Sequence, residues 1–104
     1  MQTEYYAVIF TNQQTTATEG YSEMADKMEA LAKEQPGYLG MDHARSEISI
    51  TISYWETLED IRNWKEQVDH QIAQKTGREK WYAWYKTRIC KVNREYSFDR
   101  NTTP

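Results

Sequence analysis

The sequence predicts an α+β domain of the ferredoxin-like class, in which an antiparallel four-stranded sheet carries both helices on one face. Two observations predict it. Residues 48–53 alternate apolar and polar side chains with the period of a strand and residues 5–11 are rich in aromatic and β-branched side chains, while two other segments repeat apolar side chains with the period of a helix. Their order along the chain is β-α-β-β-α-β. With 104 residues we expect one domain over residues 1–98 and a tail over residues 99–104.

The first strand is expected at residues 5–11. Its two faces are both apolar, one with Tyr6, Val8 and Phe10, the other with Tyr5, Ala7 and Ile9. A strand of this kind should be covered on both sides. Residues 12–18 are polar and predict a loop, and the first helix should then run from residue 20 or 21 to about residue 34. Its apolar stripe consists of Tyr21, Met24, Ala25, Met28, Leu31 and Ala32.

The next two strands are expected at residues 38–45 and 48–53, joined by a tight turn near Ser46 and Glu47. The helix before them should end at Pro36 and Gly37, because this pair breaks helices. The second of these strands has one apolar and one hydroxyl face. Its apolar face carries Ile48, Ile50 and Ile52, and its hydroxyl face carries Ser49, Thr51 and Ser53.

A second helix should begin after Thr57, a good N-cap residue, with Asp60 in its first turn. Gly77 should break or bend it, and the last strand is expected over residues 82–96. The buried stripe of this helix consists of Leu58, Ile61, Trp64, Val68 and Ile72.

The two sheet faces should be covered differently. We expect the helices to cover the face with the three isoleucines, and a second copy of the chain to cover the opposite face. The reason is that the first strand is apolar on both sides in a chain too small to bury both alone. The small side chains Ser49, Thr51 and Ser53 should then leave space inside a dimeric barrel.

Composition excludes several classes of function. The chain has 16 acidic and 13 basic residues without a basic run, which argues against nucleic acid and anionic membranes as partners. No apolar stretch is long enough to span a bilayer, and residues 1–4 do not resemble a signal peptide. The single cysteine, Cys90, excludes an intrachain disulfide and a multi-cysteine zinc site, and we expect no metal. We expect a soluble cytoplasmic protein.

Aromatic residues are concentrated in the second half of the chain, together with basic side chains such as Arg62, Arg78 and Arg88. This combination is typical of a cavity that binds a flat organic ligand. The aromatic residues are Tyr54, Trp55, Trp64, Trp81, Tyr82, Trp84, Tyr85 and Tyr96.

Four short segments carry a resemblance to a known family. They are residues 36–40 (PGYLG), 52–56 (ISYWE), 61–65 (IRNWK) and 77–82 (GREKWY). With them the chain resembles the antibiotic biosynthesis monooxygenase (ABM) domain family over residues 5–98. The resemblance implies a dimeric α+β barrel that oxygenates small molecules in a cavity between sheet and helices.

Within that family, some members oxidise polycyclic phenols with dioxygen and no cofactor, and others bind haem and cleave its ring. The haem-degrading branch uses an Asn on the first strand, and a Trp and a His on the second helix. Trp64 matches the Trp. Asn12 is displaced along the strand, His70 is closer to Trp64 than the pattern requires, and Gln74 stands where the His would fall.

The candidate site follows from these residues. We expect Trp64 to be a cavity wall and oxyanion donor, His70 the base, and Arg78 or Arg88 the partner of an anion. On a continuous helix His70 would point into solvent, away from the buried stripe, unless the helix breaks after Glu66. The expected cavity lining is Ser49, Thr51, Ser53, Trp64, Tyr82, Trp84 and Tyr85; Tyr82 and Trp84 should share one face of the last strand, with Tyr85 on the other.

Two functions remain open from the sequence. The first is cofactor-independent oxygenation of an aromatic or quinone-like compound, with no cofactor required. The second is a dimer that binds a hydrophobic ligand or haem without turnover, or that degrades haem. If haem binds, we expect His70 rather than His43 to ligate it. Asp42 and His43 do not form a dyad, because neighbours in a strand point to opposite faces.

Overall fold

The computed structural model describes residues 4–70 and 76–102. The elements follow one another as β1 (Tyr5–Gln14), α1 (Tyr21–Lys33), β2 (Tyr38–Arg45), β3 (Ser49–Trp55), α2 (Leu58–His70) and β4 (Tyr82–Val92). A π-helical turn, η1 (Gly77–Trp81), leads into β4, and a 3₁₀ turn, η2 (Arg100–Thr102), lies near the C-terminus.

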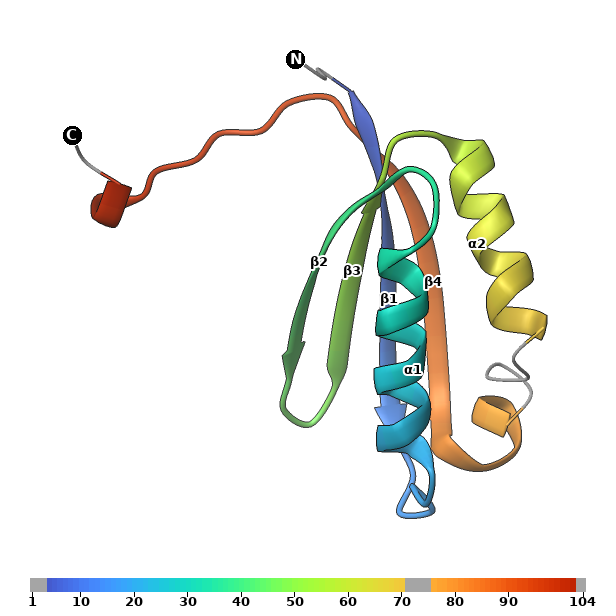
Figure 1. Cartoon of the computed structure of the whole chain (residues 1–104). Coiled ribbons are helices and arrows are strands. Elements are labelled where there is room, and N and C mark those ends of the chain that lie inside the picture. Colours follow the sequence, from blue (N-terminus) through green and yellow to red (C-terminus); the bar gives the residue numbers. More distant parts are fainter. Residues whose placement is uncertain (1–3, 71–75, 103–104) are drawn as a thin grey trace.

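The strands form one antiparallel sheet in the order β2-β3-β1-β4. Figure 1 shows α1 in front of the sheet and α2 beside β4 on the same side. The β-α-β-β-α-β order and the ferredoxin-like class are therefore confirmed, including the expected pairing of the last strand with the first.

Contacts from the helices identify the face that they cover. Trp64 on α2 stacks on Trp55 of β3, with ring centroids 5.8 Å apart, and Tyr21 on α1 meets Tyr82 of β4 at 5.9 Å. Alternation along β3 then places Ser53, Thr51 and Ser49 on the same face as Trp55. We call this side the covered face and the other side the open face.

The prediction that the helices cover the isoleucines is wrong. Ile50 and Ile52 lie on the open face, opposite Thr11 and Ile9 of β1. The largest residue of β3 decides the orientation: Trp55 is fully buried, and its Nε1 donates a hydrogen bond of 2.9 Å to Ser53 Oγ. Because side chains alternate, burying Trp55 under the helices turns the isoleucines outward.

The ends of two strands differ from the prediction. β1 continues to Gln14, since Asn12 pairs with Tyr85 and Gln14 with Tyr82 across β4. Asn12 therefore lies inside the sheet and not in a loop. β4 ends at Val92 instead of residue 96, because Val92 pairs with Tyr5, the first residue of β1.

Local chemistry fixes the start of α2. Thr57 Oγ1 accepts a hydrogen bond of 3.0 Å from the Asp60 amide and donates one of 2.8 Å to the Asp60 carboxylate, which confirms Thr57 as the helix cap. Gly37 has a φ of 83°, and a Cβ there would collide with the Asp60 side chain. The loop before β2 thus packs directly against the first turn of α2.

After Val92 the chain leaves the sheet and runs away from the body of the domain (Figure 1). Two large aromatic residues of this segment, Tyr96 and Phe98, are 85% and 77% exposed. Over residues 4–70 and 76–102 we find no helix whose length and apolar character would suit it to cross a bilayer.

Candidate functional site

A row of hydroxyl groups runs along the covered face of β3. Ser49 and Ser53 are buried, and Thr51 is half-buried. Ser53 accepts from the Trp55 indole, and Thr51 Oγ1 lies 2.8 Å from His43 Nδ1. The buried hydroxyl of Ser49 has no hydrogen-bond partner among the protein atoms. The hydroxyl groups at the Ser53 end of the row are therefore hydrogen-bonded, and the one at the Ser49 end is not.

Two amide side chains of β1 extend this unsatisfied end. Asn12 is 1% exposed, and neither its Oδ1 nor its Nδ2 has a partner. The Nε2 of Gln14 is also buried without an acceptor. Asn12 faces Ser49 across the β1–β3 ladder, so we call Asn12, Gln14 and Ser49 the buried polar cluster. A buried polar group left unpaired costs about 1–3 kcal/mol, and such groups call for a functional explanation.

An aromatic group lies beside this cluster. Phe10 is 5.4 Å, centroid to centroid, from both Tyr82 and Tyr85, and Tyr21 packs edge-on against Trp81 at 5.4 Å. Burial raises the pKa of Tyr82, and the neighbouring Tyr21 raises it further. The Tyr82 hydroxyl is therefore a neutral hydrogen-bond donor over the whole physiological range.

A second aromatic group occupies the other end of the covered face. It consists of the stacked Trp55 and Trp64, with Tyr38 edge-on to Trp55 at 5.6 Å. Trp55 lies six positions after Ser49 in β3, which corresponds to about 20 Å along the strand. The hydroxyl row thus joins an indole-rich end to an amide-rich end.

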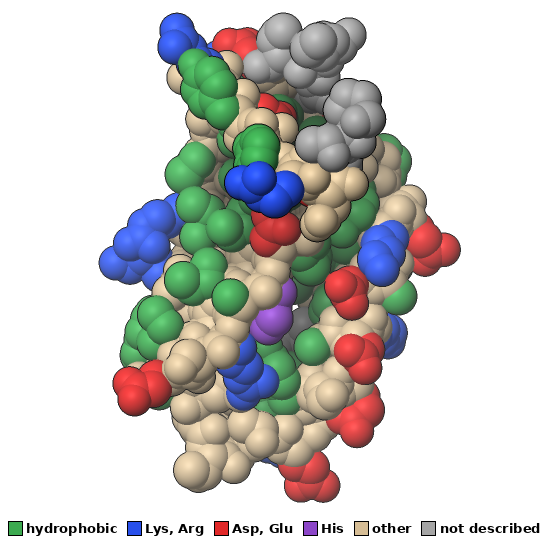
Figure 2. Space-filling view, turned by 90° about the vertical axis from the view of Figure 1, so that its left-hand side faces the viewer, with side chains coloured by type: hydrophobic (Ala, Val, Ile, Leu, Met, Phe, Trp, Pro, Cys, Tyr) green, Lys and Arg blue, Asp and Glu red, His purple; other side chains and the backbone are tan. Residues whose placement is uncertain are grey.

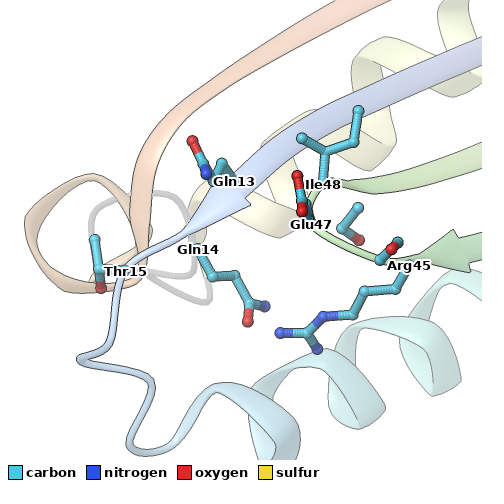
Figure 3. Close-up of a pocket in the computed structure, with 8 residues that line it drawn as sticks. Gln13, Gln14, Thr15, Arg45, Glu47 and Ile48 are labelled. Carbon is cyan, nitrogen blue, oxygen red and sulfur yellow. The ribbon is translucent and has the colours of Figure 1, made fainter.

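A pocket of 260 Å³ opens at the amide-rich end, next to the β2–β3 turn. Figure 3 shows the side chains of Gln14 and Arg45 reaching toward each other from different strands. The Arg45 guanidinium lies 5.9 Å from the centroid of the Tyr21 ring. The pocket is lined by Gln13, Gln14, Thr15, Arg45, Ser46, Glu47, Ile48 and Ser49.

The open face has a pocket of its own, with a volume of 400 Å³ and a lining of Tyr5, Leu39, Asp42, Tyr54 and Glu95. Within it the Tyr54 hydroxyl donates to Asp42 Oδ2 at 2.7 Å. This bond to the carboxylate raises the pKa of Tyr54 to about 12, and burial contributes. Here every polar group named has a partner, in contrast to the buried polar cluster.

The expected lining residues divide between the two faces. Trp64, Tyr82 and Tyr85 join the three hydroxyl residues on the covered face, through the contacts given above. Trp84 does not, because its indole donates to Gln13 and is 43% exposed. The prediction that Tyr82 and Trp84 share a face is wrong: the register shift at Gln13/Gln14 brings Tyr82 to the side of Tyr85.

The expected ionic residues are spread over the domain. Arg78 donates to the Tyr85 hydroxyl at 3.4 Å, at the margin of the aromatic group. Arg88 pairs with Ile9 and so belongs to the open face. His70 is the last residue of α2, and its side chain lies outside the described part of the structure. His43 is exposed on the edge strand β2.

Figure 2 views the molecule from the side of β2 and shows a hollow between the sheet and the helical layer, with a histidine side chain at its margin. Hydrophobic side chains border the hollow. In the portion of the chain with described side chains, no group of three or more His, Cys, Asp or Glu residues could hold a metal ion.

Sequence reasoning missed Gln14 and Arg45 as site residues, and it considered Asn12 only as a displaced match to the Asn of the haem-degrading branch. Asn12 and Gln14 fell in the predicted loop, where exposed amides need no explanation. The length of β4 was the signal that could have placed them. A strand of 11 residues needs a partner strand longer than the predicted residues 5–11. Extending β1 to match would have placed Asn12 inside the sheet.

Comparison with known proteins gives one sequence relative and a set of similar folds. YqjZ from Bacillus subtilis (strain 168), an uncharacterized protein, is 41% identical over 100 residues, covering 94% of this chain and 88% of YqjZ. No family model matches the chain.

Among solved structures, a putative antibiotic biosynthesis monooxygenase from Nitrosomonas europaea superimposes with a TM-score of 0.68 at 19% identity, covering 86% of this chain and 90% of that one. A variant of SnoaB, a cofactor-independent oxygenase from Streptomyces nogalater, has a TM-score of 0.69 at 13% identity over 89% and 96%. A putative antibiotic biosynthesis monooxygenase from Bordetella bronchiseptica has a TM-score of 0.63 at 15% identity over 88% and 98%.

Proposed function

The chain belongs to the same family as YqjZ and has the fold of the antibiotic biosynthesis monooxygenases, and from this premise we propose that it is a cofactor-independent oxygenase of a planar aromatic compound. The substrate would bind on the covered face, between the sheet and the helices. SnoaB, with the same fold, is described as a cofactor-independent oxygenase.

The observation that carries the proposal is the polarity of the covered face. Beside the aliphatic Val8 and Ile89, this face holds buried hydroxyls and amides between two aromatic groups. A few polar groups within aromatic walls are the usual composition of a small-molecule site. The unpaired atoms of Asn12 supply both a donor and an acceptor there.

In the proposed reaction the substrate supplies the electrons. For a phenol with an adjacent ring CH₂, as in a hydroxyanthrone, a base removes a proton from the phenol or from the CH₂, and the resulting carbanion–phenolate reacts with dioxygen. One oxygen atom replaces the two hydrogens of the CH₂ as a carbonyl, and the other leaves as water, so four electrons pass from carbon to oxygen. The protein holds the oxyanion through the Asn12 amide and the neutral Tyr82 hydroxyl.

Two histidines are candidates for the base. His43 lies on the covered side of β2, and its contact with Thr51 through Nδ1 leaves Nε2 to accept a proton. His70 remains the candidate on α2, the helix that carries a histidine in the haem-degrading branch of the resembled family. Replacing each by Gln separates them, because only the loss of the base should lower kcat while leaving the binding of the substrate in place.

Dioxygen uptake tests the function. Wild-type protein, with metals removed by chelation, should consume dioxygen with at least one member of a panel of hydroxyanthrones and related phenols that carry a ring CH₂. Asn12→Ala should reduce kcat by about 100-fold, as the loss of an oxyanion donor does elsewhere. No uptake by the wild type above the uncatalysed rate across the panel would contradict the proposal.

A second candidate is a dimer that binds haem or another hydrophobic ligand, with or without degrading it. It is favoured by His43, an exposed histidine on the covered side whose Nε2 is available as an axial ligand. Haem titration followed at the Soret band tests it. A band lost in His43→Ala supports ligation by His43, a band lost in His70→Ala supports the sequence-based expectation, and no specific band rejects haem.

We also propose that the chain forms a homodimer through the open faces. These faces carry Ala7, Ile9, Ile50 and Ile52, and the last three are only partly buried within one subunit. Tyr96 and Phe98, exposed on the segment after β4, offer further apolar surface to a second copy. Sedimentation at micromolar concentration should give twice the mass of the chain, and a stable monomer would reject this interface.

A further inference from the structure

We propose that the pocket at the amide-rich end binds a carboxylate, and that the substrate is therefore an aromatic carboxylic acid. This inference rests on the proposed function, because the ring is assigned to the covered face and the carboxylate to Arg45, Gln14 and Ser49. These side chains come from the ends of three neighbouring strands, β2, β1 and β3.

The pocket is rich in hydrogen-bond donors. The Nε2 of Gln14 is a donor, and the Ser49 hydroxyl can donate; both are buried without a partner. Ser49 is 2% exposed and lines the pocket. Arg45 adds a planar guanidinium, whose paired N–H groups match the two oxygens of a carboxylate.

Arg45 is held in place by the covered face and not by an acidic partner. Its guanidinium lies over the Tyr21 ring, and its charge acts on Tyr82, whose pKa it lowers against the effect of burial. Among the described residues no carboxylate forms an ion pair with Arg45. The positive charge is thus available to a ligand whose ring reaches Tyr21 and Tyr82.

The surrounding charges limit where the anion can sit. Glu47 also lines the pocket and is exposed on the β2–β3 turn. A carboxylate ligand must therefore enter deep enough for Gln14 and Ser49 to bind it, away from Glu47. Figure 3 shows this arrangement, with Gln14 and Arg45 on the inner side and Glu47 at the turn.

Calorimetric titration of the full-length protein with a matched ligand pair tests the inference. The pair is 1-hydroxy-2-naphthoate and 1-naphthol, which differ only in the carboxylate. Wild-type protein should bind the naphthoate at least about tenfold more tightly. Arg45→Met should remove this preference while leaving the affinity for 1-naphthol within about twofold. Arg45→Lys should restore part of the preference, because lysine carries the positive charge but not the paired N–H groups of a guanidinium.

Arg94→Met is the matched control, since Arg94 lies on the segment after β4 and contacts Tyr96. It makes the same change of charge and should alter neither affinity. Gln14→Met provides a second variant in case Arg45→Met does not fold. It should weaken naphthoate binding several-fold and raise the Tm of the free protein, because it removes a buried unpaired amide.

Each result decides the question. Equal binding of the two ligands by wild type, or the same response to Arg45→Met and Arg94→Met, would overturn the carboxylate assignment while the proposed function stands. Binding of neither ligand, with no dioxygen uptake from the panel, would overturn both. A naphthoate preference that survives Arg45→Met and Gln14→Met would place the anion elsewhere and also reject the inference.

Discussion

Along β3 the two faces of the sheet differ in the reverse of the usual sense. In most sheets of this kind the side under the helices is apolar and the other side is polar. Here the covered face carries Asn12, Ser49 and Ser53, all buried, and the open face carries Ile50 and Ile52. The same strand, β3, supplies both sets from alternating positions.

This reversal indicates what each face is for. Polar groups that are buried and left unpaired lower stability unless a ligand binds them, so the covered face is suited to a small molecule. Apolar groups left in contact with water favour association, so the open face is suited to a second subunit. The following substitutions test the two faces separately.

The largest effect is expected for Trp55, which anchors the covered face. Trp55→Ala should lower the free energy of unfolding by about 3–5 kcal/mol, because a fully buried indole is replaced by a cavity next to Trp64. Tyr54→Ala, one residue earlier and on the open face, should cost about 1 kcal/mol. Urea denaturation measures both; equal losses would show that the helices do not pack on Trp55 as described.

A charge on the open face should separate the proposed dimer. Ile52→Arg would bury an unpaired cation in the interface and should raise the dimer dissociation constant by at least about 100-fold. Sedimentation velocity gives the constant. Leu58→Arg, on an exposed position of α2, is the control and should leave the dimer intact. Dissociation by the control and not by Ile52→Arg would place the interface on the helical side.

Asn12→Leu should stabilise the protein and damage its function. Removing two buried unpaired atoms should raise the free energy of unfolding by about 1–2 kcal/mol, while ligand binding and dioxygen uptake fall, as is common when a site residue is replaced for stability. Gln13→Leu, the next residue on the opposite face, should change stability by less than about 0.5 kcal/mol. A destabilised Asn12→Leu protein would show that the amide is satisfied in the folded chain.

The smallest effect concerns pH and the open face. Because Asp42 raises the pKa of Tyr54 to about 12, the folded state favours the protonated phenol. Its contribution to stability is complete below the ordinary tyrosine pKa of about 10 and is lost as pH rises through about 12. Tyr54→Phe should remove this loss of stability at alkaline pH. In a pH titration followed by tyrosinate absorbance, the variant should lack one tyrosine that ionises at high pH. An unchanged titration would contradict the hydrogen bond to Asp42.

The sequence predicted the order of the elements because their periods are clear and short-range. Alternation of isoleucines with hydroxyl residues identified β3, and Thr57 identified the start of α2. It could not decide which side of β3 the helices cover. Helices over the isoleucine face and helices over the hydroxyl face fit the alternation equally well. The choice depends on where a single large side chain, Trp55, is buried.

The site was harder to predict than the fold. Trp64 and the hydroxyl row were recognised as candidates from composition and resemblance, but Asn12 and Gln14 were assigned to a loop. Their burial depends on the pairing of β1 with β4, a long-range contact that local patterns do not contain. The position of Trp84 depends on a register shift at Gln13/Gln14, which a strict period of two does not predict.

NMR of the ligand-bound protein tests the central claim, that the polar covered face is the binding face, most directly. In a titration with a planar aromatic ligand, the Thr51 methyl and the side-chain NH₂ of Asn12 should shift. The methyl groups of Ile50 and Ile52, on either side of Thr51 but on the open face, should not. Shifts of the two isoleucines with Thr51 and Asn12 unchanged would contradict the claim.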